Sequence, residues 1–106
     1  MTQTMGFIYL IKNSEDCTYK IGVAKDPRKR LKEIQTGNSS ELLIVDMYQT
    51  ENSFKIEKIL HRRYSHLHKH GEWFSLSLIE QFNFLDDCKK IEEGIAILRE
   101  SGNTFV

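Results

Sequence analysis

Glu57 and His61 are spaced so that a helix would bring an acid and an imidazole side by side. Residues four apart project from the same face of an α-helix, so the two side chains could face a common site. Three more histidines, His66, His68 and His70, alternate along the following segment. With His61 they could hold a transition metal such as Zn²⁺, but no cysteine lies nearby and the C-x-x-C spacing is absent. We therefore expect these three histidines to be solvent-exposed.

Basic residues gather in two segments although the 15 lysines and arginines balance 15 acids. Residues 19–38 hold six bases and two acids, and residues 54–75 hold five bases and two acids. Salt limits the reach of distant acids to about 8–10 Å, so a local basic face could still attract a phosphate backbone. The alternative is that these charges form solvated helix faces.

Three segments are typical of β-strands. Residues 6–12 and 18–24 are short, rich in β-branched and aromatic side chains, and separated by a polar stretch, which predicts a hairpin. Residues 41–49 form a nearly continuous apolar run. That run predicts a third strand in a central position, covered on both faces.

Helix signals occupy the rest of the chain. Asp26 offers an N-cap oxygen and Pro27 suits a first helical position, which predicts a helix over residues 27–36. Apolar residues at spacings of three and four predict a second helix over about residues 52–67 and a C-terminal helix over residues 77–99.

The Ser77 and Glu80 pair has the spacing of a capping box at the start of that last helix. The order β-β-α-β-α-α predicts an α+β fold, with a small three-stranded antiparallel sheet flanked by helices. At 106 residues the chain is expected to be a single domain over 1–106, with its core in residues 6–76. Residues 103–106 are expected to fray.

The apolar stretches are too short to cross a bilayer, and the start lacks a signal-type segment. We therefore expect no membrane partner and a cytoplasmic location. Cys17 and Cys88 make no disulfide scaffold, so both are expected to be reduced thiols.

A series of motifs in this order resembles the GIY-YIG nuclease superfamily. Phe7-Ile8-Tyr9 resembles the GIY strand, and Lys20-Ile21-Gly22 resembles the YIG strand with lysine in place of tyrosine. The further matches are Gly22-Val23-Ala24-Lys25-Asp26 with Arg30, Ile34-Gln35-Thr36-Gly37-Asn38, Glu57 with His61, and Gly71-Glu72-Trp73-Phe74. The series spans roughly residues 6–76. It is similar to the branch, found in phage and bacterial proteins, that carries KIG and GEWF motifs.

The resemblance implies metal-dependent hydrolysis of DNA phosphodiester bonds with Mg²⁺ or Mn²⁺. Such a reaction needs an activated water and positive charge on the developing oxyanion. The resemblance gives Tyr9 a contact to the attacking water, Arg30 a clamp on the phosphate and Glu57 the metal. Lys20 would lower the pKa of Tyr9 or bind phosphate, and His61 would transfer a proton.

Each of these residues also has a purely structural interpretation. Tyr9 could be packing, Lys20 an exposed sheet residue and Arg30 a solvated helix residue, while Glu57 and His61 could form a helix-surface set.

Other residues near these motifs are assigned supporting parts. Tyr19 should point to the opposite face from Lys20 and belong to the core. Trp73 and Phe74 could stack on bases but are expected to fill the core, and Glu72 could orient a neighbouring backbone or basic group. Four exposed bases are expected to attract the DNA backbone or to aid solubility: Lys25, Arg28, Lys29 and Lys32.

The sequence therefore predicts a small endonuclease acting on double-stranded DNA in a bacterial or phage-infected cell. With no appended recognition domain it would be weakly specific, homodimeric or recruited by a protein partner. A nucleic-acid-binding or regulatory module that keeps the fold without efficient cleavage stays open, since the net charge is zero and Lys20 replaces a tyrosine. A protein-interaction effector of phage type is the third alternative.

Overall fold

The first three strands lie where the sequence places them. In the computed structural model, which describes residues 5–102, β1 (Gly6–Asn13) and β2 (Tyr19–Ala24) pair as an antiparallel hairpin. β3 (Leu42–Thr50) pairs antiparallel with the other side of β1. The expected fraying of residues 103–106 falls outside the described part of the chain.

Two short strands extend the sheet beyond the predicted three. β4 (His68–His70) and β5 (Trp73–Phe74) form a tight hairpin, and β5 pairs antiparallel with β2. The strand order is therefore β3-β1-β2-β5-β4, so the α+β class is confirmed and the three-stranded sheet is wrong. Strands of two and three residues are too short to show an alternating pattern, which is why the sequence indicates only a turn in this segment.

β3 lies at the edge of the sheet rather than in its centre, which β1 and β2 occupy. Its apolar run arises because helices cover both of its faces. Ile44 and Met47 pack toward α1 (Pro27–Thr36), while Val45 and Tyr48 pack toward α4 (Phe84–Glu100). A continuous apolar run thus indicates cover on both faces and says nothing of central position.

The helices confirm the predicted caps but not every predicted length. Asp26 caps α1 by accepting a hydrogen bond from the Lys29 amide at 3.2 Å, with Pro27 at the helix start. α2 (Ser53–Arg63) is shorter than predicted, because the last turn, η1 (Ser65–Leu67), is a 3₁₀ helix.

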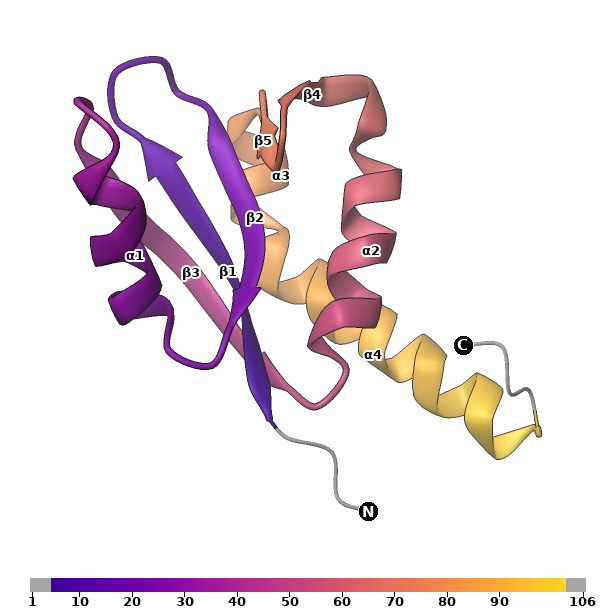
Figure 1. Cartoon of the computed structure of the whole chain (residues 1–106). Helices are drawn as coiled ribbons and strands as arrows, with labels where there is room; N and C mark the ends of the chain where they lie inside the picture. Colours follow the sequence, from indigo (N-terminus) through magenta and orange to yellow (C-terminus); the bar gives the residue numbers. More distant parts are fainter. Residues whose placement is uncertain (1–4, 103–106) are drawn as a thin grey trace.

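The predicted C-terminal helix is two helices. α3 (Leu78–Phe82) begins with the capping box formed by Ser77 and Glu80, as expected. It ends at Asn83, which also caps the start of α4. The short α3 lets the chain change direction before α4 crosses the sheet (Figure 1).

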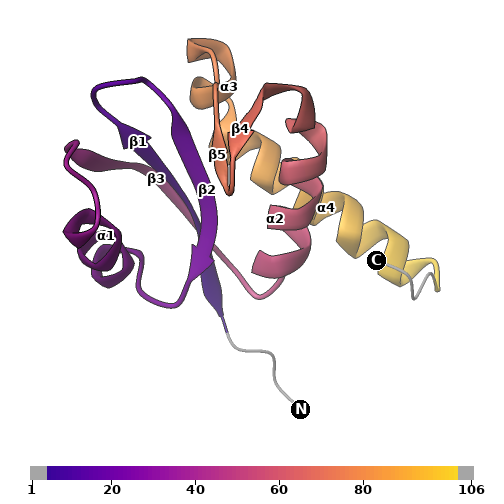
Figure 2. The ribbon, with the colours of Figure 1, turned by 45° about the horizontal axis from the view of Figure 1, so that its top comes forward.

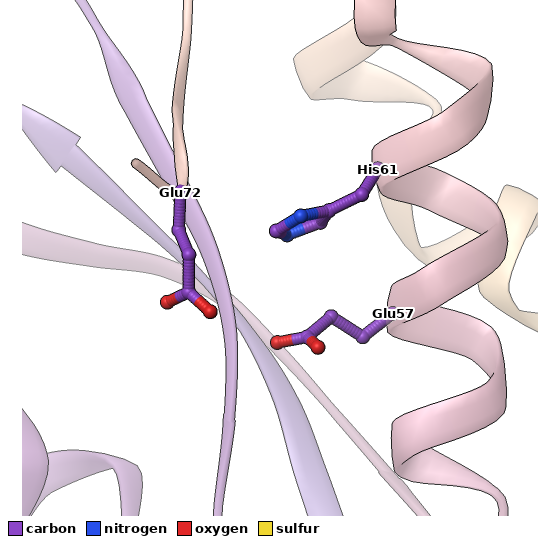
Figure 3. Close-up of side chains that lie close together, drawn as sticks. All are labelled: Glu57, His61 and Glu72. Atoms are coloured by element: carbon purple, nitrogen blue, oxygen red, sulfur yellow. The ribbon is translucent and has the colours of Figure 1, made fainter. Parts of the chain in front are cut away.

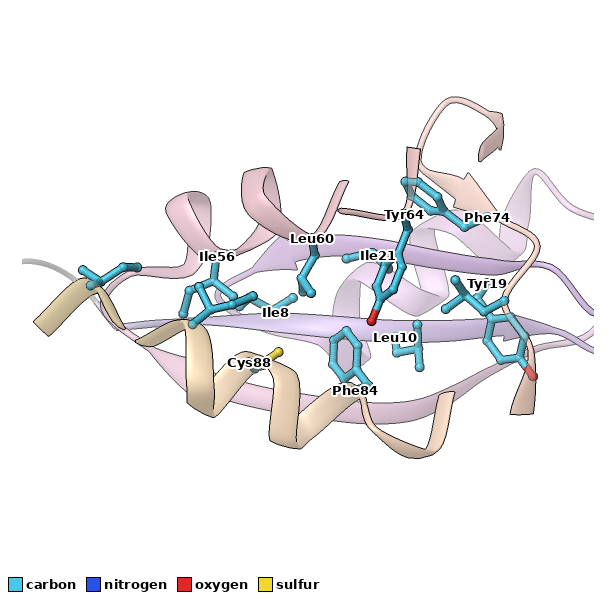
Figure 4. Packing of buried hydrophobic residues seen from close by; sticks show 13 residues of the cluster. Ile8, Leu10, Tyr19, Ile21, Ile56, Leu60, Tyr64, Phe74, Phe84 and Cys88 are labelled. Carbon is cyan, nitrogen blue, oxygen red and sulfur yellow. The ribbon is translucent and has the colours of Figure 1, made fainter. Parts of the chain in front are cut away.

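The helices cover the sheet from both sides, with α1 on one face and α2 and α4 on the other (Figures 1 and 2). On the second face, Ile8, Leu10 and Ile21 of the sheet pack with side chains of α2 and α4, as Figure 4 shows. Tyr19 is buried in this cluster, which confirms its predicted core position, and so is Phe74.

The α1 face has its own, smaller core. Tyr9, Ile11 and Leu42 pack there with Leu31 and Ile34 of α1. Because side chains alternate along a strand, Lys20 points to this face and Tyr19 to the opposite one. The sheet thus separates the tyrosine of β1 from the tyrosine of β2.

Two smaller expectations can be compared with this fold. Both cysteines are free thiols, with Cys17 exposed and Cys88 buried. None of the helices in residues 5–102 is long and apolar enough to cross a membrane.

Candidate functional site

The outer edge of β2 is where the candidate site is built. β5 pairs with β2 only at Tyr19 and Lys20, so the rest of this edge is left without a neighbouring strand. The Ile21 amide instead donates to the Glu72 carbonyl at 3.1 Å. The Ile21 carbonyl accepts a hydrogen bond from His61 Nε2 at 2.8 Å. These two bonds bring α2 and the segment before β5 to the same stretch of β2.

The bond to Ile21 determines which ring nitrogen of His61 is available. A carbonyl oxygen can only accept, so Nε2 carries the hydrogen. In the neutral ring, Nδ1 is left with the free lone pair. The proton transfer expected of His61, or a bond to a metal, would therefore use Nδ1.

Glu57, His61 and Glu72 form the acidic part of the site. Glu57 and His61 project from α2 toward Glu72 on the other side, as Figure 3 shows. One donor atom from each residue lies within 4.8 Å of the others. Carboxylate and imidazole donors are ligands that Mn²⁺ accepts, and carboxylates also suit Mg²⁺.

One Glu57 oxygen supports this interpretation. Oε2 is buried and has no hydrogen-bond partner among residues 5–102. Burial raises the pKa of the Glu57 carboxyl, and the charge of Glu72 adds to this, while His61 and Lys20 oppose it. When this carboxylate is ionised, its buried Oε2 has no bonded cation among the described residues, so the donor set fits a divalent metal.

Lys20 is held by Glu72. Its Nζ donates to Glu72 Oε1 at 2.7 Å, and its side chain is only 11% exposed, against 42% for Glu72. The ammonium also lies 5.9 Å from the centre of the Trp73 ring, within reach of a cation–π contact. Trp73 is the residue that pairs with Lys20 across the strands.

Tyr9 lies on the α1 face, directly opposite Gly22 in the strand pairing. A Cβ at Gly22 would come 2.3 Å from the Tyr9 hydroxyl oxygen, so only glycine leaves room for the phenol. The residue is 1% exposed, and its hydroxyl lies close enough to the Arg30 guanidinium for the two groups to affect each other's pKa. Arg30 is half-exposed and also reaches Glu33 at 3.5 Å.

The partner of Tyr9 is thus Arg30 and not Lys20, contrary to one of the roles expected for Lys20. Burial raises the pKa of the Tyr9 hydroxyl more than the nearby Arg30 guanidinium lowers it. The phenol is therefore neutral at ordinary pH. Because Arg30 is the more exposed of the two, a phosphate that draws the guanidinium outward would uncover the hydroxyl.

Only some of the bases in and just before α1 line a hollow beside Arg30. Lys25 and Lys29 line an open hollow of about 260 Å³ together with Arg30. Arg28 and Lys32 are exposed but are not among the lining residues. A larger hollow of about 640 Å³ lies elsewhere, around Glu92 and Arg99, and includes none of the candidate residues.

The aromatic and histidine expectations are confirmed. Phe74 is buried and the partly buried Trp73 packs against the α1-face core, so both contribute packing. His66, His68 and His70 are exposed, and His68 Nε2 bonds to a backbone carbonyl, that of Gly71, at 2.8 Å. None of these three histidines belongs to the metal-type cluster of the described residues.

Sequence reasoning left Glu72 out of the candidate site residues, although orienting a basic group was one role open to it, and it missed the physical role of Gly22. The signal for Glu72 was its place in the GEWF segment, beside a tryptophan that the fold pairs with Lys20. The signal for Gly22 was a glycine inside a strand, which often marks close approach of another group. The strand pairing is needed to show that Trp73 lies opposite Lys20 and that Gly22 lies opposite Tyr9.

Comparison with known families gives one match. The family model described as the T5orf172 domain matches residues 6–96, a span that includes all of the site residues. No curated protein and no solved structure matches the chain.

Proposed function

Because the chain belongs to the T5orf172 domain family, found in phage and bacterial proteins and related to nuclease-type domains, we propose that it is a DNA endonuclease dependent on Mg²⁺ or Mn²⁺. The reaction proposed is hydrolysis of phosphodiester bonds. The observation that carries it is the gathering of two cations, one phenol, two carboxylates and an imidazole around one edge of β2.

Arg30 is the residue suited to grip the scissile phosphate. Its guanidinium is permanently charged, half-exposed, and able to bind two oxygens at once. The guanidinium cannot accept the hydrogen of the Tyr9 hydroxyl, so beside a phosphate held by Arg30 that hydroxyl could donate to a phosphate oxygen or orient the attacking water. With a raised pKa, Tyr9 acts in this scheme as a neutral donor rather than as a base.

Glu57 is the proposed metal ligand, with His61 beside it. A bound Mg²⁺ or Mn²⁺ would supply a water of lowered pKa and positive charge on the phosphate. His61 would accept or return a proton through Nδ1, since Nε2 is held by the Ile21 carbonyl.

Lys25 and Lys29 would extend the phosphate contacts beyond the reacting group, because they share the hollow beside Arg30. The partner proposed is double-stranded DNA. Contacts to phosphate carry no sequence information, so the chain alone would be weakly specific. A homodimer or a recruiting protein would then supply any greater specificity for particular DNA sites.

Two observations favour a second candidate, a nucleic-acid-binding or regulatory module without efficient cleavage. Tyr9 is 1% exposed, and Lys20 is engaged by Glu72 rather than free. A chain that bound DNA in this state without releasing either group would not cleave.

Nicking of supercoiled plasmid by the purified chain tests the proposal. We expect Mg²⁺- or Mn²⁺-dependent nicking that falls at least about 100-fold in Glu57→Gln and in Arg30→Ala, since each removes a group that stabilises transition-state charge. A matched control, Glu93→Gln at an exposed position on α4, should keep nearly all activity.

The neutral variant at position 57 should also fold well. Folding raises the pKa of Glu57, so its ionised form destabilises the native state at neutral pH, and glutamine removes that charge. Its melting temperature should therefore be no lower than that of the wild type.

DNA binding without cleavage by any form would support the nucleic-acid-binding module. Neither binding nor cleavage would support a protein-interaction effector.

A further inference from the structure

Glu72 stands between two cations, one that is present in the chain and one that the proposed function requires. One of its oxygens accepts the Lys20 ammonium at 2.7 Å, and a donor atom of the same side chain lies within 4.8 Å of donors of Glu57 and His61. A carboxylate has two oxygens and can bind more than one partner. Glu72 could therefore bind the Lys20 ammonium, a metal ion, or both.

The distances suit a metal ion with little rearrangement. Oxygen ligands lie about 2.0–2.1 Å from Mg²⁺, so two donors of one ion are at most about 4.2 Å apart. Donors already within 4.8 Å need to close by less than about 1 Å. Glu72 is 42% exposed and precedes the two-residue strand β5, so its side chain has room to make this change.

The charges around Glu72 also favour a divalent metal ion. Two carboxylates, Glu57 and Glu72, face each other, and the buried Glu57 Oε2 has no partner among the described residues. Lys20 neutralises one of these charges and leaves the other without an adjacent hydrogen-bonded cation. A divalent ion would compensate both, whereas a single ammonium compensates one.

We propose that Glu72 is the second carboxylate ligand of the metal bound by Glu57, and that Lys20 is an internal cation that competes with the metal for Glu72. This rests on the proposed function, which requires a divalent ion at Glu57. In the metal-free chain the ammonium holds Glu72 in place. Metal binding draws Glu72 away and leaves the Lys20 ammonium available to the phosphate.

Titration of the full chain with Mn²⁺ in the absence of DNA, followed by the electron paramagnetic resonance signal of free Mn²⁺, tests this directly. The wild type should bind one ion saturably. Glu72→Gln should weaken binding at least about tenfold, the size of effect typical when a group supporting a metal site is removed. Lys20→Met should tighten binding several-fold, because the competing charge is gone.

Two further variants keep the test independent of folding defects. Glu41→Gln removes an exposed acid at the start of β3, far from the β2 edge, and should bind like the wild type. Glu72→Gln takes the charged partner from the Lys20 ammonium, so the double variant Lys20→Met with Glu72→Gln is compared with Lys20→Met alone. Weaker Mn²⁺ binding by the double variant supports the proposal.

The proposal is overturned if the wild type shows no saturable site, if removal of Glu72 leaves the affinity unchanged in both backgrounds, or if Lys20→Met does not tighten binding. Plasmid nicking by the same samples separates this from the proposed function. Nicking with Mn²⁺ affinity indifferent to Glu72 refutes only the inference. Glu72-dependent Mn²⁺ binding in a wild type that never nicks DNA refutes only the endonuclease.

Discussion

Gly22 is the residue at which the backbone most directly limits the site. The phenol of Tyr9 occupies the space where any other residue would place a Cβ, with the hydroxyl oxygen 2.3 Å and Cζ 2.5 Å from that position. Gly22→Ala should displace the ring and move its hydroxyl away from Arg30. We expect DNA cleavage to fall at least about tenfold and the free energy of unfolding to fall by about 1–3 kcal/mol, as overpacking typically costs.

Plasmid nicking and urea unfolding measure these two effects. Gly94→Ala is the matched control, since an added Cβ there meets nothing within 4 Å and Gly94 lies inside α4. Alanine favours a helix interior, so this control should be slightly stabilising and fully active. Equal activity of the Gly22 and Gly94 variants would show that the Tyr9 hydroxyl takes no part in the reaction.

Residue types predicted which side chains are in the site better than they predicted which partners those side chains have. Alternation along β1 and β2 places Tyr9 and Lys20 on one face, and helix spacing places Glu57 beside His61. The pairing of Tyr9 with Arg30 and of Lys20 with Glu72 depends on interactions between distant segments. Such interactions leave no periodic signal in a single sequence.

At the scale of elements, hydrogen bonds to Glu92 link α4 to β3. Its carboxylate accepts hydrogen bonds from the Tyr48 hydroxyl at 2.6 Å, from the Thr50 hydroxyl and from the Asn52 side chain at 3.4 Å. Burial alone would raise the pKa of Glu92, but these hydrogen bonds together hold it below the ordinary value. The network is therefore a stabilising one.

Glu92→Ala should lower the free energy of unfolding by about 1–3 kcal/mol at pH 7, because it removes hydrogen bonds to a charged group. A carboxyl whose pKa is depressed by folding stabilises above its unfolded pKa of about 4.3, and this contribution is lost as pH falls through the folded pKa. The difference from wild type should thus shrink below about pH 4.

Urea titrations at pH 7 and pH 3.5 provide the comparison. The neighbouring exposed residue supplies a control, since Glu93→Ala should change stability by less than about 0.5 kcal/mol. If Glu92→Ala lowers the free energy of unfolding equally at pH 7 and pH 3.5, then side-chain packing, and not the ionised carboxylate, stabilises the contact between α4 and β3.

The sequence predicted the long elements and missed the short ones. β1, β2, β3 and α1 carry strong patterns or caps and were found within a few residues. The hairpin of β4 and β5 was missed because its two strands total only five residues and are held by the pairing of β5 with β2 rather than by local preference. The break at Asn83 was missed because apolar spacing continues through it from α3 into α4.

On the scale of the whole molecule, charge is unevenly distributed although its sum is zero. Four bases and one acid of α1 lie on one side of the sheet. On the other side, α4 holds five acids and three bases, while α2 holds four bases and one acid. Screening separates the two sides at physiological salt, where the Debye length is about 8 Å. The hollow lined by Lys25, Lys29 and Arg30 lies on the α1 side, so we expect DNA to approach from that side.

The salt dependence of DNA binding measures how many phosphates that side neutralises. Each phosphate neutralised contributes about −0.9 to the slope of log K against log salt concentration. Replacing both Lys25 and Lys29 by alanine should make the slope shallower by about 0.9 for each phosphate that is no longer neutralised, and should weaken binding to unrelated sequences alike. The same two replacements at Lys89 and Lys90, exposed on α4, remove equal charge from the opposite side and should leave the slope unchanged. Equal slopes for the two double variants would mean that net charge alone attracts DNA, and that the α1 side is not the surface on which it binds.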